Sequence, residues 1–112
     1  MDISYNCENQ KFNYRACAMI IAENKILAMH DERSPYFYLP GGRVKMGETA
    51  EQAVVREVQE ELGVTPKITR PLWLNQAFLP KMWIIYIIMN CVFIFWWIFQ
   101  RQLYWKEETS LL

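Results

Sequence analysis

The sequence predicts an α/β domain in which several strands accompany one well-defined helix. Two observations lead to this class: apolar runs bounded by turn residues lie between positions 12 and 39, and an amphipathic segment with helix caps lies at 50–62. With 112 residues the chain forms one domain at most. Its core closes only if every segment contributes.

The first elements are short strands. Residues 12–22 are rich in apolar and β-favouring side chains, and residues 25–29 form a second apolar run after a polar corner, which predicts a hairpin. Residues 36–39 predict a short aromatic strand. The Pro-Gly-Gly sequence at 40–42 predicts a sharp break at which the backbone can closely approach a ligand.

The helix is the best-specified element. Thr49 is the predicted N-cap, Gln52 completes a capping box, and Gly63 suits the left-handed position after the last turn, so the helix should span 50–62. A strand interrupted by prolines should follow, centred on 72–78. The helix should pack on the sheet through an apolar face made of Ala50, Ala53, Val54, Val58 and Leu62.

The last third of the chain has an unusual composition. No glycine or proline follows Pro80, and no charged residue occurs between Lys81 and Arg101. Met82–Phe99 is interrupted only by Asn90, and its 18 residues would form a helix about 27 Å long. This segment is therefore a candidate transmembrane helix at the short limit.

Charge and cysteine content narrow the class of partner. Twelve basic and twelve acidic residues cancel, so nucleic acid is not expected, and a phosphate ligand has to be held by local groups or by a metal. Cys7 and Cys17 with His30 fit no standard zinc spacing.

The N-terminus is too polar for a secretory signal, so we expect a cytoplasmic protein, with membrane anchoring through 82–99 as the alternative. The sequence leaves open whether the protein forms a homodimer.

Residues 42–64 concentrate carboxylates at regular spacing. Glu57, Glu60 and Glu61 stand at i, i+3 and i+4 on one helix face, where like charges cost roughly a few tenths of a kcal/mol per pair. A magnesium or manganese ion would offset this repulsion, and such ions bridge phosphate oxygens and activate water. The alternative is a solvated helix face paired with Arg56.

This spacing resembles the Nudix box, the signature of the Nudix hydrolases. The match runs from Gly42 through Glu48 and the segments Arg56-Glu57-Val58 and Glu60-Glu61 to Gly63-Val64. With the preceding strand and turn, the resemblance extends from Phe12 to Phe78. It implies a Nudix-type mixed β-sheet carrying the Nudix-box helix, with the C-terminal part truncated or replaced by an apolar helix.

The resemblance also implies roles for the box residues. Glu60 and Glu61 would bind Mg²⁺ (or Mn²⁺) together with the carbonyl oxygen of Gly41, and Glu57 would be a further ligand or the general base. Arg56 would act in catalysis by orienting Glu57 through a charged hydrogen bond. Structural or outer-shell positions are implied for Gly42, Glu48 and Gly63.

Family members cleave a nucleoside diphosphate linked to another group, through attack of water at phosphorus, and this is the expected activity. The pocket for the base or sugar lies outside the box. Tyr36, Tyr38 and Trp73 are candidate stacking groups, although positions in an aromatic core are favoured. The alternatives are a catalytically impaired Nudix fragment and a membrane-tethered Nudix-like protein.

The tail departs from what the family implies, and its codons suggest a reason. Read one base out of frame, Met82-Trp83-Ile84 encodes Val-Asp and Met89-Asn90-Cys91 encodes Glu-Leu, which resembles a Nudix strand. We therefore expect residues 1–78 to be the N-terminal part of a Nudix domain and residues 79–112 to be a frameshifted tail. Sequencing the gene tests this hypothesis, because the restored frame has to continue past the present stop codon.

Overall fold

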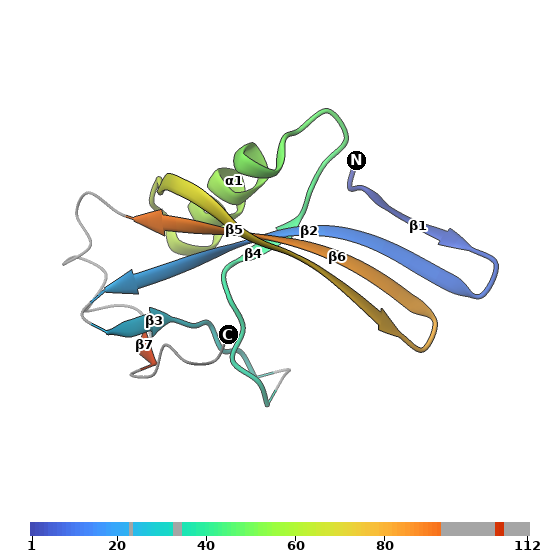
Figure 1. Ribbon diagram of the computed structural model, residues 1–112, viewed down its shortest axis with the longest axis horizontal. Helices are drawn as coiled ribbons and strands as arrows, with labels where there is room; N and C mark the ends of the chain where they lie inside the picture. The colour runs from blue at the N-terminus through green and yellow to red at the C-terminus, as the bar shows by residue number, and fades with distance from the viewer. Residues whose placement is uncertain (23, 33–34, 93–104, 107–112) are drawn as a thin grey trace.

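The computed structural model describes residues 1–22, 24–32, 35–92 and 105–106 (Figure 1). Within these residues a β-sheet forms the body of the domain, and the helix α1 (Ala50–Leu62) packs on it. The strands, in chain order, are β1 (Ser4–Cys7), β2 (Gln10–Ala22), β3 (Lys25–Leu27), β4 (Gly41–Arg43), β5 (Lys67–Leu79), β6 (Met82–Val92) and β7 (Trp105–Lys106).

The sheet is organised around β2. Among the described residues the strand order is β5-β6-β2-β3-β7, and β1 and β4 also pair with β2 outside this path. β6 runs parallel to β2, whereas β5 and β6 form an antiparallel hairpin. The expected mixed sheet carrying the helix at 50–62 is thereby confirmed for the part of the chain that the structure describes.

Three hairpin turns are built without glycine. Glu8, Asn24 and Lys81 adopt positive φ angles of 55°, 63° and 67° at the β1–β2, β2–β3 and β5–β6 turns. Asparagine tolerates this left-handed conformation, while glutamate and lysine adopt it less often. Lys81 therefore lets the chain reverse into β6, at the start of the segment whose apolar composition had predicted a helix.

The alternation of side chains along β2 divides the interior into two layers. Ala16, Ala18 and Ile20 belong to the core beneath α1, where Val54 and Val58 are fully buried. Burial of such a side chain contributes about 1.5–3 kcal/mol. A smaller cluster on the opposite face contains Cys17, Met19, Ile26 and Ile88. The small alanines of β2 let the helix approach the sheet closely.

The helix begins and ends where its caps predict. The Thr49 hydroxyl accepts a hydrogen bond from the Gln52 backbone N–H at 3.1 Å, and the Gln52 side chain accepts one from the Thr49 N–H at 2.9 Å. Gly63 ends the helix in the left-handed conformation, with φ of 74°. The predicted span of 50–62 is confirmed because these signals are local to the segment.

The prediction of an apolar helix in the last third is wrong for residues 82–92, which form β6. Ile84, Ile85, Ile87 and Ile88 are β-branched, and hydrogen bonds from β2 and β5 satisfy both edges of the strand. Among the described residues no helix has the length and apolar character needed to span a membrane. The rest of the predicted segment, residues 93–99, lies outside the described residues.

The predictions for residues 36–42 are corrected in part by the sheet. The strand expected at 36–39 is reduced to a single bridge between Met29 and Tyr38. The chain bends at Pro40 within the break expected at 40–42, and Gly41 then begins β4, which pairs with Arg15 to Cys17 of β2. The pairing brings the glycine turn against the centre of the sheet, so its position depends on a distant strand.

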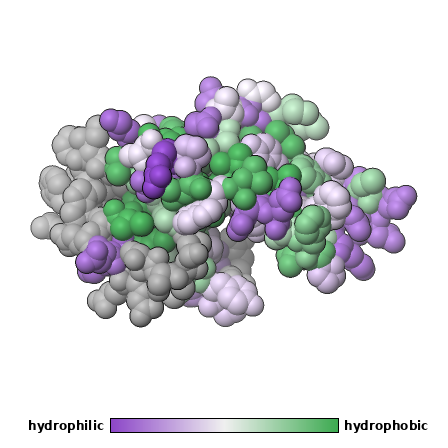
Figure 2. Space-filling view, in the orientation of Figure 1, coloured by the Kyte–Doolittle hydropathy of each residue, from purple (hydrophilic) through white to green (hydrophobic). Residues whose placement is uncertain are grey.

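The hairpin ends of β1–β2 and β5–β6 extend beyond α1 (Figure 1). Phe78, Leu79 and Trp83 at this end are 65%, 53% and 50% exposed, and the Phe78 and Trp83 rings meet edge to face at 5.0 Å. In the same orientation, hydrophobic side chains are visible at the surface between hydrophilic ones (Figure 2). The core is therefore concentrated where α1 covers the sheet.

Candidate active site

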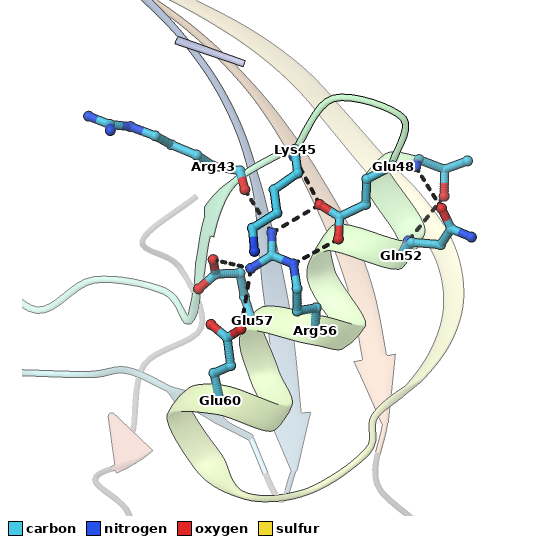
Figure 3. A network of polar contacts seen from close by, with 8 residues as sticks. Arg43, Lys45, Glu48, Gln52, Arg56, Glu57 and Glu60 are labelled. Carbon is cyan, nitrogen blue, oxygen red and sulfur yellow. Dashed lines mark hydrogen bonds and ion pairs between the residues drawn. The ribbon is translucent and has the colours of Figure 1, made fainter. Parts of the chain in front are cut away.

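Arg56 joins the loop before α1 to the carboxylates on the helix (Figure 3). Its Nε and Nη2 donate to the two carboxylate oxygens of Glu48 at 2.7 Å and 2.9 Å, and its Nη1 donates to Glu57 Oε1 at 2.8 Å. Nη2 also donates to the Arg43 carbonyl at 2.9 Å. The planar guanidinium fork suits these simultaneous contacts. The expected hydrogen bond between Arg56 and Glu57 is thus present.

Glu48 anchors this network from the loop. One carboxylate oxygen also accepts a hydrogen bond from the Lys45 N–H at 2.9 Å, which closes the turn before the helix. The Arg56 hydrogen bonds, with a smaller contribution from Lys45, lower the pKa of Glu48 to about 2, although partial burial opposes the shift. Glu48 therefore stays ionised and paired with Arg56 at neutral pH.

This shift predicts an acid-sensitive contribution of Glu48 to stability. The pKa of Glu48 in the folded chain is below the ordinary value of 4.5, so its contribution is present above pH 4.5 and is lost as the pH falls toward about 2. We expect the difference in unfolding free energy between wild type and Glu48→Gln to shrink by about 1–2 kcal/mol across this range. Urea unfolding at several pH values measures the difference.

The exposed Glu51, in the first turn of the same helix, provides the control. Wild type and Glu51→Gln should keep a nearly constant difference in unfolding free energy over the same range. An equal pH dependence for both variants would contradict the assignment to the Arg56–Glu48 pair.

Glu57 lies directly over Gly42. A Cβ atom at position 42 would stand 2.4 Å from Cδ of Glu57, closer than such contacts allow. The absence of a side chain at Gly42 therefore makes room for the Glu57 carboxylate. Arg56 holds Oε1 of this carboxylate, and the described residues show no hydrogen bond to Oε2.

Glu61 contacts Gly41, which precedes Gly42 in β4. Its Oε1 accepts a hydrogen bond from the Gly41 N–H at 2.9 Å. Burial raises the pKa of Glu61, and the nearby charge of Glu57 adds to this effect, while the Gly41 hydrogen bond and the Arg15 charge oppose it. The net result is a partly desolvated carboxylate that a bound cation would stabilise in its ionised form.

The carboxylates of Glu57, Glu60 and Glu61 project from one face of α1, but they do not converge into a preformed metal site. Glu60 is more exposed, with 56% of its side chain accessible, and its Oε1 lies 3.6 Å from Arg56 Nη1. Within the described residues no group of three acidic, histidine or cysteine side chains is close enough to hold an ion as it stands. The donors are nevertheless all oxygens, which suit Mg²⁺ or Mn²⁺, and the desolvated Glu61 favours a cation. The residues fit such an ion if Glu57, Glu60 and Glu61 draw together around it.

A cavity of about 490 Å³ opens on the face of the sheet opposite α1. Polar groups from β2 and β4 line one side of it, and apolar residues of β6 line another. The polar lining includes Asn13, Arg15 and Arg43, and the apolar lining includes Ile84 and Ile88. Arg15 and Arg43 are directly opposite each other in the β2–β4 register. The cavity therefore lies beside the strand that also carries Gly41 and Gly42.

The family follows from a comparison of the whole sequence. The profile that describes the NUDIX domain matches residues 11–98, which is more than half of the chain. The chain belongs to the NUDIX family. The match continues past Phe78, where the sequence motifs ended, and includes β6. The frameshift hypothesis stays a prediction, because only the gene sequence tests it.

Two relatives of this NUDIX domain resemble it in sequence over short segments. An ADP-ribose pyrophosphatase from Methanocaldococcus jannaschii is 49% identical over 53 residues, which are 45% of this chain and 31% of that protein. An 8-oxo-dGTP diphosphatase from Escherichia coli is 71% identical over 28 residues, covering 25% of this chain and 22% of its own. The chain thus spans less than a third of the length of these two relatives.

The fold of the NUDIX domain also has solved counterparts. The MutT protein from Methanosarcina mazei Go1 superposes with a TM-score of 0.66 at 23% identity, covering 87% of this chain and 71% of that one. At this level of identity the likeness concerns the fold. It supports the mixed sheet with one helix that the described residues show.

The structure corrects the burial predicted for three aromatic side chains. Tyr36, Tyr38 and Trp73 are 72%, 38% and 46% exposed, so the favoured prediction of an aromatic core is wrong for all three. Of these only Tyr38 lines the cavity. Sequence reasoning missed Asn13, Arg15 and Arg43. The polar residues at alternating positions 13 and 15 of an otherwise apolar strand were the available signal.

Proposed function

We propose that this chain is a divalent-metal-dependent pyrophosphohydrolase that cleaves the pyrophosphate linkage of a nucleoside diphosphate joined to another group. The observation that carries the proposal is the Arg56–Glu57 pair, set over Gly42 beside the partly desolvated Glu61. The names of its relatives, an ADP-ribose pyrophosphatase and an 8-oxo-dGTP diphosphatase, support a nucleotide derivative as substrate.

In this proposal the metal is held by Glu60, Glu61 and the carbonyl oxygen of Gly41, with Glu57 as a further ligand or as the general base. When bound, a magnesium or manganese ion supplies charge neutralisation at phosphate oxygens and lowers the pKa of water. The chain's own residues provide the orientation. Arg56 holds Oε1 of Glu57, which leaves Oε2 available to accept a proton from the attacking water.

Glu48 and Gly42 complete the arrangement without contacting substrate. Both carboxylate oxygens of Glu48 bind the Nε–Nη2 edge of the Arg56 guanidinium, which holds the arginine beside Glu57. Gly42 provides the space in which the Glu57 carboxylate lies. The precise position of a general base matters because proton transfer requires hydrogen-bond contact.

A turnover assay with Glu60→Gln tests the proposal. Purified chain is incubated with Mg²⁺ and separately with ADP-ribose, 8-oxo-dGTP, UDP-sugars and unmodified nucleoside triphosphates, and the released phosphates are measured. We expect hydrolysis of at least one compound, its loss on chelation of the metal, and a fall of about 10²-fold or more in Glu60→Gln.

Glu51→Gln is the matched control, since it removes the same charge from the same helix away from Gly41 and Gly42. It should keep wild-type turnover, and both variants should show the wild-type melting temperature within a few degrees. Hydrolysis that survives in Glu60→Gln would reject this metal assignment. Failure of the folded wild type to hydrolyse any of these compounds would favour the catalytically impaired fragment.

A further inference from the structure

The cavity opposite α1 has a cationic side that the carboxylate chemistry does not use. Arg15 and Arg43 are cross-strand neighbours, so their guanidinium groups extend from the same face of adjacent strands. Like charges at directly opposed positions destabilise a sheet. An anionic ligand between or over the two groups would remove this repulsion.

Neither arginine is neutralised by a strong ion pair within the described residues. Arg43 Nη1 lies 3.8 Å from Asp2 Oδ2, and the two side chains are 36% and 42% exposed, so this pair contributes little. The Arg15 side chain has no hydrogen bond or salt bridge to any residue in the described part of the chain. The cavity therefore retains two guanidinium groups that are able to bind an anion.

A buried amide adds a further polar group to the same lining. Asn13 is only 4% exposed, and its Oδ1 accepts a hydrogen bond from the Ser4 hydroxyl at 2.9 Å. Its Nδ2 has no acceptor among the residues that the structure describes. A buried donor without a partner costs free energy. A ligand oxygen in the cavity would satisfy it.

The cationic lining is continuous with the carboxylate site through β4. Glu57 lies over Gly42, Glu61 bonds to the Gly41 N–H, and the Arg43 carbonyl bonds to Arg56. Gly42 and Gly41 pair with Ala16 and Cys17, the two residues that follow Arg15 on β2.

We propose that Arg15 and Arg43 bind the terminal phosphate of a nucleoside triphosphate, and that the chain therefore prefers nucleoside triphosphates to nucleoside diphosphate sugars. This inference rests on the proposed function. A triphosphate carries a terminal phosphate dianion that a sugar-linked diphosphate lacks, and a guanidinium recognises such a group by paired charged hydrogen bonds. Asn13 contributes an amide contact, and Ile84 and Ile88 provide an apolar wall for the nucleoside.

The test compares kcat/KM for dGTP and for ADP-ribose in wild type, Arg15→Gln and Arg43→Gln. We expect Arg15→Gln to lower kcat/KM for dGTP by about 10- to 100-fold and for ADP-ribose by less than about threefold. Arg43→Gln should act in the same direction. Arg70→Gln is the matched control, because Arg70 lies exposed on β5 and outside the cavity lining. An unchanged ratio between the two substrates in both cavity variants would overturn the inference.

Binding of inorganic tripolyphosphate without added metal separates this inference from the proposed function. Calorimetry should show that Arg15→Gln weakens binding by about tenfold or more relative to wild type and Arg70→Gln. If Arg15-dependent binding occurs in a chain that hydrolyses nothing, the inference stands and the proposed function fails. If hydrolysis occurs but tripolyphosphate binds all variants equally, the proposed function stands and the inference fails. Melting temperatures confirm folding, and removal of a repelling charge should not lower them.

Discussion

We expect replacement of Glu57 by glutamine to lower kcat by about 10²- to 10⁴-fold while the chain stays folded. Glutamine has nearly the same shape and can still accept the Arg56 hydrogen bond through its amide oxygen, so the geometry over Gly42 is conserved. The negative charge and the proton-accepting oxygen are lost. Steady-state kinetics on the best substrate of the panel measure the effect.

A magnesium titration of the same variant distinguishes the two roles considered for Glu57. If Glu57 is mainly the general base, the Mg²⁺-induced rise in melting temperature should be close to that of wild type. If it is a ligand, the rise should shrink together with kcat. Glu51→Gln serves as the control on α1. A variant that retains more than a tenth of wild-type kcat would exclude both roles.

The second large effect is expected at Gly41, where alanine should lower the free energy of unfolding by about 2–4 kcal/mol. A Cβ atom there would stand 2.3 Å from the Ala16 carbonyl oxygen and 2.7 Å from Cys17 Cα. Both are backbone atoms of β2, so relief requires β4 to move away from the strand with which it pairs. The φ of +156° adds strain for a residue with a side chain.

Alanine substitutions at Gly63 and Gly42 provide the comparison for Gly41→Ala. At Gly63 an added Cβ meets nothing within 4 Å, so Gly63→Ala should cost only about 1–2 kcal/mol from its left-handed conformation. At Gly42 the three atoms nearest to the added Cβ belong to the Glu57 side chain, which can rotate. Gly42→Ala should therefore lose activity more than stability. Urea unfolding followed by circular dichroism gives the three stabilities, and an order in which Gly63→Ala is the most destabilised would contradict the structure.

The residues of the box could be predicted from the sequence because their arrangement is local. Glu57, Glu60 and Glu61 lie within one turn or so of the same helix, and the caps at Thr49 and Gly63 fix where that helix begins and ends. The resemblance to the Nudix box implied the hydrogen bond between Arg56 and Glu57, and the observed bond agrees with it. Their contacts with Gly41 and Gly42 depend on the fold.

The cavity residues could not be assembled from the sequence in the same way. Arg15 and Arg43 are far apart in the chain and become neighbours only through the register of β2 with β4. Ile84 and Ile88 join them because β6 lies parallel to β2. A shift of one residue in either register would turn these side chains to the other face.

The sequence by itself determined the helix at 50–62, its caps and the spacing of its carboxylates. A helix satisfies its backbone within its own segment, so nearby residues are enough to specify it. Only the tertiary structure decided that residues 82–92 form a strand and that Arg15 and Arg43 share a cavity. The hydrogen bonds of a strand go to distant partners, here β2 and β5, and an apolar run alone does not show whether those partners exist.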